Sequence, residues 1–309
     1  MSTKGLLFID ANQYLDLYQM ESGRRLLAAL DEQRSYIFVT AQIVDEVERR
    51  KVNVVKLFLA QQELQLKSIS VPDHILGSAD ARVAEIRKQL QGISGSVKDT
   101  KQKFGQLSSE LLSSVSKSND EVSKALTAIF SQAALHNDGE LKGARLRKER
   151  GGPPGKKNDP LGDQLSWEQL LNKCREKPTL WIITKDSDYA TKHEGELFLN
   201  AALYRELVHV YRSNPEVYCF DTLAKGLEHF TSTTKVKAEK LPTAEETKKI
   251  KKEQESLPSL GWLSNDDSGY LPAQAVFFQR QFDPMLQAAL RSQLTNEADA
   301  IFPPVKDKS

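Results

Sequence analysis

The sequence predicts an α/β fold in which a central parallel sheet is flanked by helices. Short, continuous apolar runs are typical of strands that are buried on both faces. Four such runs are expected to form strands, at residues 5–9, 36–39, 181–183 and 216–220. Segments with helical spacing of apolar residues follow these runs, and alternation of strands and helices indicates a parallel sheet covered by helices.

The helices of this region follow from apolar spacing and capping residues. Residues 14–30 place Leu26, Leu27 and Leu30 on one face of a helix. Thr40 is a favourable N-cap residue and is expected to begin a long helix after the second strand. Further helices are expected at residues 164–174, 197–211 and 221–230.

The chain of 309 residues is expected to contain three regions. Residues 1–234 would form the α/β domain. Residues 235–256 hold almost no large apolar side chain, so we expect a charged linker. Residues 257–309 regain aromatic residues and helical spacing, and are expected to form a small helical C-terminal appendage.

A helical insertion is expected to interrupt the α/β domain at about residues 78–140. Ile86, Leu90 and Ile93 continue a series of apolar residues spaced by three or four, which is typical of a helix seam. We expect a long helical hairpin with a break near residues 116–119. A solvated helical pair with only a packing role is the simpler interpretation.

Composition leaves several classes of function open. The formal net charge is +1, so bulk charge does not demand a nucleic-acid partner. Cys174 and Cys219 lie far apart without metal-type spacing, and we expect two buried thiols. No apolar run approaches the roughly 18 residues needed to cross a membrane, and the N-terminus does not resemble a signal peptide. We therefore expect a cytoplasmic protein without a membrane partner.

Four acids follow predicted strands or lie in the first turns of predicted helices: Asp10, Glu46, Asp163 and Asp186. Ligand sites in parallel sheets collect beyond the carboxyl ends of the strands. Carboxylates that meet there repel one another unless a cation or protons balance them, and hard oxygen ligands suit Mg²⁺ or Mn²⁺. The arrangement therefore predicts phosphodiester chemistry assisted by two metal ions.

Each acid also has a simpler interpretation when it is taken alone. Asp163, Asp186 or Asp188 could cap a helix. Glu46 could be one charge on an exposed helix face. The recurrence of an acid directly after a strand favours a shared site.

A basic segment follows the insertion at residues 141–160. It contains seven lysines and arginines around a Gly/Pro core at residues 151–155, so we expect a basic loop. Such a loop could hold phosphates, whereas the simpler interpretation is a solvated linker. The residues expected to bind nucleic acid are Arg147, Lys148, Arg150, Lys156 and Lys157.

The order of these motifs resembles that of the PIN-domain nucleases over about residues 5–232. The matching segments are Phe8-Ile9-Asp10-Ala11-Asn12, Glu46, Gly162-Asp163 and Thr184-Lys185-Asp186-Ser187-Asp188. More narrowly, the chain is similar to a bacterial PIN-like subgroup with a long helical insertion. That similarity rests on Gly152-Pro153-Pro154-Gly155-Lys156-Lys157 followed by Gly162-Asp163-Gln164-Leu165-Ser166-Trp167.

The resemblance implies a PIN-like three-layer fold and a metal-dependent endoribonuclease that hydrolyses phosphodiester bonds by a two-metal mechanism. Residues matching the ligands of Mg²⁺ or Mn²⁺ are Asp10, Glu46, Asp163 and Asp186, with Asp10 bridging the metals. Asp188 matches an auxiliary position and is expected to be a further metal ligand. Asn12 and Thr184 match positions that support these ligands.

Two other functions remain open from the sequence. One is a structure-specific DNA nuclease of the 5′-nuclease type, with the insertion arching over a flap. The other is a non-catalytic nucleic-acid-binding module with the same fold. We expect RNA in preference to DNA as the partner. A homodimer or an inhibitor protein could also bind through the insertion.

Overall fold

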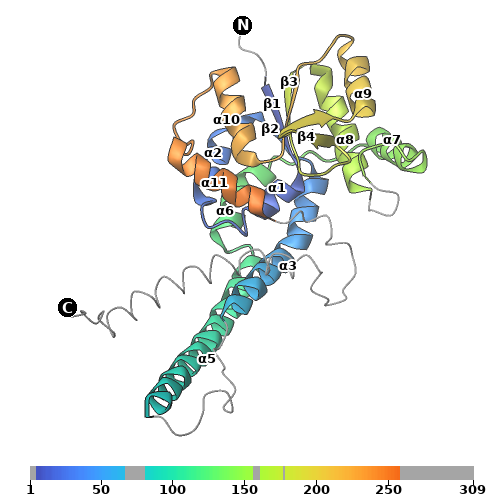
Figure 1. Ribbon diagram of the computed structural model, residues 1–309. Coiled ribbons are helices and arrows are strands. Elements are labelled where there is room, and N and C mark those ends of the chain that lie inside the picture. Colours follow the sequence, from blue (N-terminus) through green and yellow to red (C-terminus); the bar gives the residue numbers. More distant parts are fainter. Residues whose placement is uncertain (1–4, 67–80, 156–160, 177, 258–309) are drawn as a thin grey trace, which may run out of the picture. The chain divides into compact units, whose positions relative to one another are not determined.

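Four parallel strands form the central sheet in the order β2-β1-β3-β6 (Figure 1). They are β1 (Gly5–Ile9), β2 (Ile37–Phe38), β3 (Thr179–Ile183) and β6 (Val217–Phe220). The computed structural model describes residues 5–66, 81–155, 161–176 and 178–257. The central strands β1 and β3 are almost fully buried because their apolar side chains do not alternate with polar ones. The predicted α/β class with a parallel sheet is confirmed.

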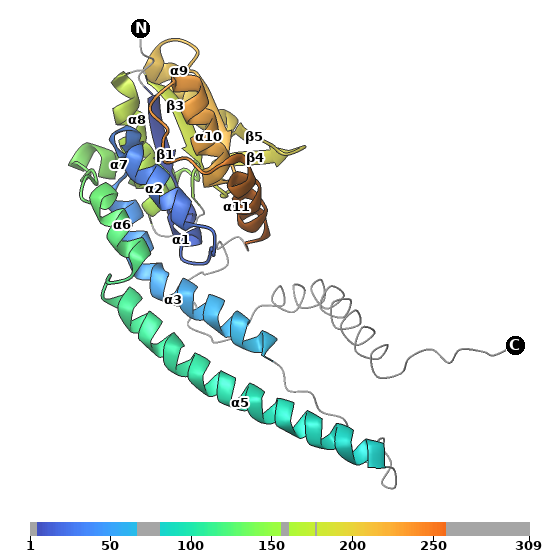
Figure 2. The ribbon, with the colours of Figure 1, turned by 90° about the vertical axis from the view of Figure 1, so that its left-hand side faces the viewer.

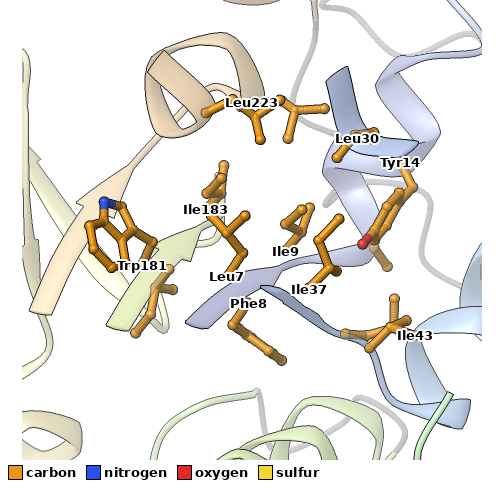
Figure 3. Packing of buried hydrophobic residues seen from close by; sticks show 14 of the residues in the cluster. Leu7, Phe8, Ile9, Tyr14, Leu30, Ile37, Ile43, Trp181, Ile183 and Leu223 are labelled. Carbon is orange, nitrogen blue, oxygen red and sulfur yellow. The ribbon is translucent and has the colours of Figure 1, made fainter. Parts of the chain in front are cut away.

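Helices cover both faces of the sheet, and alternate side chains of one strand enter different layers. Figure 3 shows Ile9 and Ile183 pointing toward Leu223 and Leu30, whereas Phe8 points to the opposite face. The first face carries α1 (Ala11–Asp16), α2 (Arg24–Glu32) and α10 (Leu223–Thr234). The second carries α3 (Ala41–Gln65), α8 (Gly162–Lys173) and α9 (Ala201–Tyr211).

The region expected to be one helix at residues 14–30 forms two, because a turn at residues 17–23 separates α1 from α2. The prediction that a helix begins at residue 197 is also wrong. Residues there belong to an antiparallel hairpin of β4 (Ala190–His193) and β5 (Glu196–Leu199), and α9 begins only after it. Gly195, with φ of 88°, provides the left-handed backbone at the hairpin turn.

The insertion is helical, but its packing partner differs from the expected hairpin. It contains α5 (Ala81–Ser116) and α6 (Glu121–Phe130), with the break at the predicted place. Helix α5 lies along the second half of α3 (Figure 2), and α6 packs against α2. Val55, Leu59 and Val115 form a small core between α3 and α5. Helix α3 continues past the main core, so its apolar stripe requires another helix as a partner.

The basic segment expected to be a loop at residues 141–160 is helical in its first part. Helix α7 (Asp138–Glu149) begins with a capping box in which Asn137 and Glu140 satisfy each other's backbone N–H groups. The helix is also stabilised by charges that interact favourably with its dipole: acidic residues in the first turn, and Arg147 and Lys148 in the last turn. Within the described residues only the Gly/Pro core remains as a loop.

The segment expected to be a charged linker at residues 235–256 contains helix α11 (Ala244–Ser256). A capping box formed by Thr243 and Glu246 begins the helix, and its apolar residue Ile250 is 1% exposed. The buried side chains of Ile250 and Gln254 attach this charged helix to the domain. The expected C-terminal appendage lies outside the described residues from residue 258 onward.

Both cysteines are free thiols: Cys174 is buried, as expected, and Cys219 is only partly buried. Among the helices that the structure describes, none has the length and apolar character needed to span a bilayer.

Candidate active site

Asp10 lies directly after β1 at the carboxyl end of the sheet. Its backbone N–H donates to the Ile183 carbonyl at 3.0 Å, so it continues the ladder between β1 and β3. The hydroxyl of Thr184 donates to Asp10 Oδ2 at 2.8 Å, and the amide of Asn12 approaches the same oxygen at 3.5 Å. Asp10 is 7% exposed. The carboxylate is thus held in place from two elements.

The turn that follows β3 is organised around the same hydroxyl. Thr184 Oγ1 accepts the backbone N–H of Asp186 at 3.0 Å, and Asp186 Oδ1 accepts the backbone N–H of Asp188 at 2.9 Å. Thr184 therefore links the carboxylate of Asp10 to the backbone of Asp186. The alternative that Asp186 or Asp188 caps a helix is wrong, because strand β4 follows this turn.

Close packing of α3 against α8 brings in the other two acids. Gly162 lies at the start of α8, where a Cβ atom would be 3.3 Å from the side chain of Gln42 on α3. The Thr40 and Ser166 hydroxyls join the same two helices at 2.9 Å. Thr40 also caps α3, as predicted, by accepting from the Ile43 N–H. The acids Glu46 and Asp163 follow on these two helices.

Glu46 and Asp163 are held differently from the acids of the strand ends. Glu46 forms an ion pair with Arg50 one turn later on α3, and both side chains are about four-fifths buried. Asp163 lies in the first turn of α8, whose N-cap is Leu161, so the N-cap interpretation of Asp163 is wrong. A carboxylate in a first turn is favoured by the helix dipole.

The electrostatics place the four acids near one buried hydroxyl at the carboxyl end of the sheet, and we call Asp10, Glu46, Asp163 and Asp186 the acid rim. Burial, and then the charges of Glu46 and Asp186, raise the pKa of Asp10 to about 7 despite the hydrogen bond from Thr184. Burial also raises the pKa of the Tyr189 hydroxyl, and the charges of all four acids add to that rise, with Asp163 the largest of them. One buried hydroxyl thus feels Asp10, Glu46, Asp163 and Asp186 together.

The chemistry of this rim suits a divalent cation, although no group of three acids, histidines or cysteines lies in a metal-holding arrangement in the described part of the chain. All donors are hard oxygens. The side-chain oxygen of Asn12 is buried and has no hydrogen-bond partner among the described residues. A cation would balance the charges of Glu46 and Asp186, which add to the effect of burial on the pKa of Asp10. Asp10, Glu46, Asp163 and Asp186, with Asp188 beside them, could therefore hold such an ion.

Arg147 has a different role from the predicted contact with phosphate. Its guanidinium donates to Glu168 at 2.6 Å, to Glu206 at 2.9 Å and to the Pro153 carbonyl at 2.7 Å. The side chain is 9% exposed. Arg147 joins α7 to α8, to α9 and to the Gly/Pro loop, because two carboxylates occupy its planar donor face.

The other residues predicted to bind nucleic acid differ from Arg147 in their exposure. Arg150 is exposed and Lys148 is half-buried. Lys156 and Lys157 lie outside the described residues.

Sequence reasoning missed Tyr189, whose ring packs between Phe8 and Trp167 at centroid distances of 6.0 and 6.1 Å. It also missed Asp221, although this acid directly follows β6 and so carries the same signal as Asp10. Burial would raise the pKa of Asp221, but hydrogen bonds and charges from Lys192 and Lys225 bring it below its usual value. Asp221 therefore lies at the same end of the sheet as the other acids, but two lysines balance its charge.

Comparison with known families agrees with this arrangement. A family model described as the PIN domain matches residues 7–189, a range that includes the four acids and the helical insertion. Searches of curated proteins and of solved structures returned no significant match. PIN domains are generally metal-dependent nucleases. The chain, with its parallel sheet and its acids at the carboxyl ends of the strands, belongs to the PIN domain family.

Proposed function

We propose that this protein is a metal-dependent endoribonuclease that hydrolyses phosphodiester bonds. The observation that carries the proposal is that four carboxylates, after β1 and β3 and on α3 and α8, all act on the buried hydroxyl of Tyr189. Such a concentration of negative charge repels a phosphate unless cations lie between the acids and the substrate. The rim is therefore suited to phosphoryl chemistry only in its metal-loaded form.

Asp10, Glu46, Asp163 and Asp186 would hold Mg²⁺ or Mn²⁺, with Asp188 as a further oxygen donor. When bound, the ions would supply an activated water and would stabilise charge on the phosphate oxygens. Thr184 fixes the orientation of Asp10 by donating to Oδ2. The unpaired oxygen of Asn12 is an additional donor at the same place.

Binding of the RNA phosphates would also require positively charged side chains near the acid rim. We propose that Arg150 and Lys148 contact phosphates near the end of α7, and that Lys156 and Lys157 do the same farther along the chain. Arg147 is left out of this set because Glu168 and Glu206 occupy its guanidinium. Contacts of this kind bind all sequences alike and weaken as salt rises.

The test is cleavage of single-stranded RNA with Mn²⁺ by the parent protein, by Asp10→Asn and by the control Asp99→Asn, which changes an exposed acid on α5. Cleavage by the parent and the control, but not by Asp10→Asn, would support the proposal. A flap DNA substrate is assayed beside the RNA. Cleavage of the flap alone would replace an RNA substrate by a DNA one, as expected for a 5′-nuclease.

Calorimetric titration with Mn²⁺ separates the nuclease from a non-catalytic module. The proposed nuclease binds the ion at the acid rim, and Asp10→Asn weakens this binding. A protein that binds RNA but takes up no Mn²⁺ would be a binding module, and the proposed activity would be wrong.

A further inference from the structure

A buried ion pair lies next to the acid rim and has no place in the function proposed above. Lys185 Nζ is 2.7 Å from Asp16 Oδ2. The side chain of Asp16 is 1% exposed and that of Lys185 is 14% exposed. Burial of two charges is unfavourable unless their geometry and further hydrogen bonds compensate for the lost hydration. Such a pair beside a site therefore requires an explanation.

The two partners come from the elements that carry Asp10 and Asp186. Helix α1 begins directly after Asp10, and Asp16 is its last residue. Lys185 lies between Thr184 and Asp186 in the turn after β3. The chain thus places the ion pair and the acids on the same two connections.

The ion pair and the Thr184 hydroxyl hold these connections together through different partners. Thr184 donates to Asp10 and accepts from the backbone of Asp186, so it joins the two acids directly. Lys185 makes its contacts elsewhere, with Asp16 and with the carbonyl of Gln254 at 3.2 Å. The end of β3 is therefore fixed by two independent links to β1 and α1.

Helix α11 supports Lys185 and lies outside the range that matches the PIN domain. The side chain of Gln254 is fully buried and accepts the backbone N–H of Ala224 at 3.1 Å. Glu253 accepts the backbone N–H of Ser22 at 3.1 Å. These bonds hold α11 against the start of α10 and the turn after α1, and so hold the Gln254 carbonyl beside Lys185.

We propose that Asp16 and Lys185 are positioning residues that set the separation of Asp10 and Asp186, and thereby the affinity of the rim for a divalent cation. This inference rests on the proposed function, because it assigns a role toward the metal ion. Groups that hydrogen-bond directly to metal ligands change metal affinity by about 10- to 100-fold when they are removed, and Asp16 and Lys185 act one step farther away through the backbone. Helix α11 becomes part of the site through its link to Lys185.

The experiment is a calorimetric titration of Mn²⁺ into the full chain, with thermal unfolding measured in parallel without metal. Four variants are compared with the parent: Lys185→Met, Lys185→Arg, the double variant Asp16→Leu/Lys185→Met, and the control Lys251→Met. The control removes a surface ion pair between α11 and Glu228. The double variant replaces both charges by apolar groups, which buried pairs often tolerate without loss of stability.

The double variant is expected to unfold near the temperature of the parent but to bind Mn²⁺ about 10-fold more weakly or worse. Lys185→Arg should retain most of the parent's affinity for Mn²⁺, because it keeps the positive charge opposite Asp16. In the double variant, RNA cleavage should recover at high Mn²⁺ concentration, and the KM for RNA should equal that of the parent. Lys251→Met should match the parent in every measurement.

Parent-like affinity for Mn²⁺ in a folded double variant would overturn the inference and leave the proposed nuclease intact. Failure of the parent itself to bind Mn²⁺ would overturn both, and the two failures are distinguished by the parent titration alone. If Lys185→Met fails to fold, the double variant and Lys185→Arg still decide the question.

Discussion

Two strand ends of the same sheet present an acid, and their surroundings make these acids chemically different. Asp10 follows β1, and burial, followed by the charges of Glu46 and Asp186, raises its pKa to about 7. Asp221 follows β6 and lies between Lys192 at 2.6 Å and Lys225 at 3.2 Å, and its pKa is lowered. An acid at a strand end therefore marks a reactive site only where its neighbours leave its charge unbalanced.

The largest expected contrast is in activity. Asp10→Asn should lower the rate of RNA cleavage by at least about 100-fold, because it removes a charge that the rim needs to hold a cation near the phosphate. Asp221→Asn should leave the rate close to that of the parent, since Lys192 and Lys225 already neutralise this carboxylate. The measurement is kcat/KM on one RNA with Mn²⁺. Equal losses in the two variants would remove the distinction between the two strand ends.

A second contrast is the pH dependence of stability in the metal-free protein. Folding raises the pKa of Asp10 from 3.8 to about 7, so the folded state holds this proton more tightly than the unfolded state. The stabilisation is present at low pH and is lost as the pH rises through about 7, by an amount on the order of a few kcal/mol. The pKa of Asp221 moves the other way, so its contribution is present above the unfolded pKa and is lost as the pH falls.

Urea unfolding from about pH 5 to about pH 8, with a chelator present, measures this dependence. The parent should lose stability over this range, and Asp10→Asn should show a flatter profile. Asp221→Asn should keep the slope of the parent over the same range, because the titration of Asp221 lies at lower pH. A parent profile that rises toward pH 8 would contradict a raised pKa of Asp10 in the folded protein.

Arg147 extends the comparison to a basic residue whose charge is fully balanced. Arg147→Met should lower the free energy of unfolding by about 2 kcal/mol, because it leaves Glu168 and Glu206 without their shared partner while both remain partly hydrated. The control Arg145→Met changes an exposed arginine of the same helix and should stay within about 0.5 kcal/mol of the parent. Similar stability of both variants would show that the ion pairs of Arg147 contribute little to the free energy of unfolding.

The smallest expected effect concerns Arg150 and Lys148. Replacing both with Ala should weaken RNA binding and lower the salt slope by about 0.7 for each lost phosphate contact with a single strand. Affinity for Mn²⁺ should remain that of the parent. Lys124→Ala, which changes an exposed lysine on α6, is the matched control. An unchanged slope in the double variant would place the RNA away from the end of α7.

Several elements could be predicted from local patterns because their causes are local. The continuous apolar run of β1, the capping hydroxyl of Thr40 and the break after α5 are properties of a few neighbouring residues, and the structure confirms each of them. The capping box of Asn137 and Glu140 was also readable in the chain, and it explains why the expected basic loop is partly a helix. The position of Asp10 and Asp186 at strand ends belongs to the same class of inference.

Other properties depend on residues that meet only after folding. No local pattern shows that Arg147 faces Glu168 and Glu206, that α5 packs against α3, or that α11 supports Lys185. The balance of charge around Asp10 and Asp221 is of this kind, since Asp10 and Asp186 are far apart in the chain while Lys192 reaches Asp221 from the β4–β5 hairpin. Backbone and apolar preferences act over a few residues, whereas Coulomb interactions and burial depend on distances that the assembled layers determine.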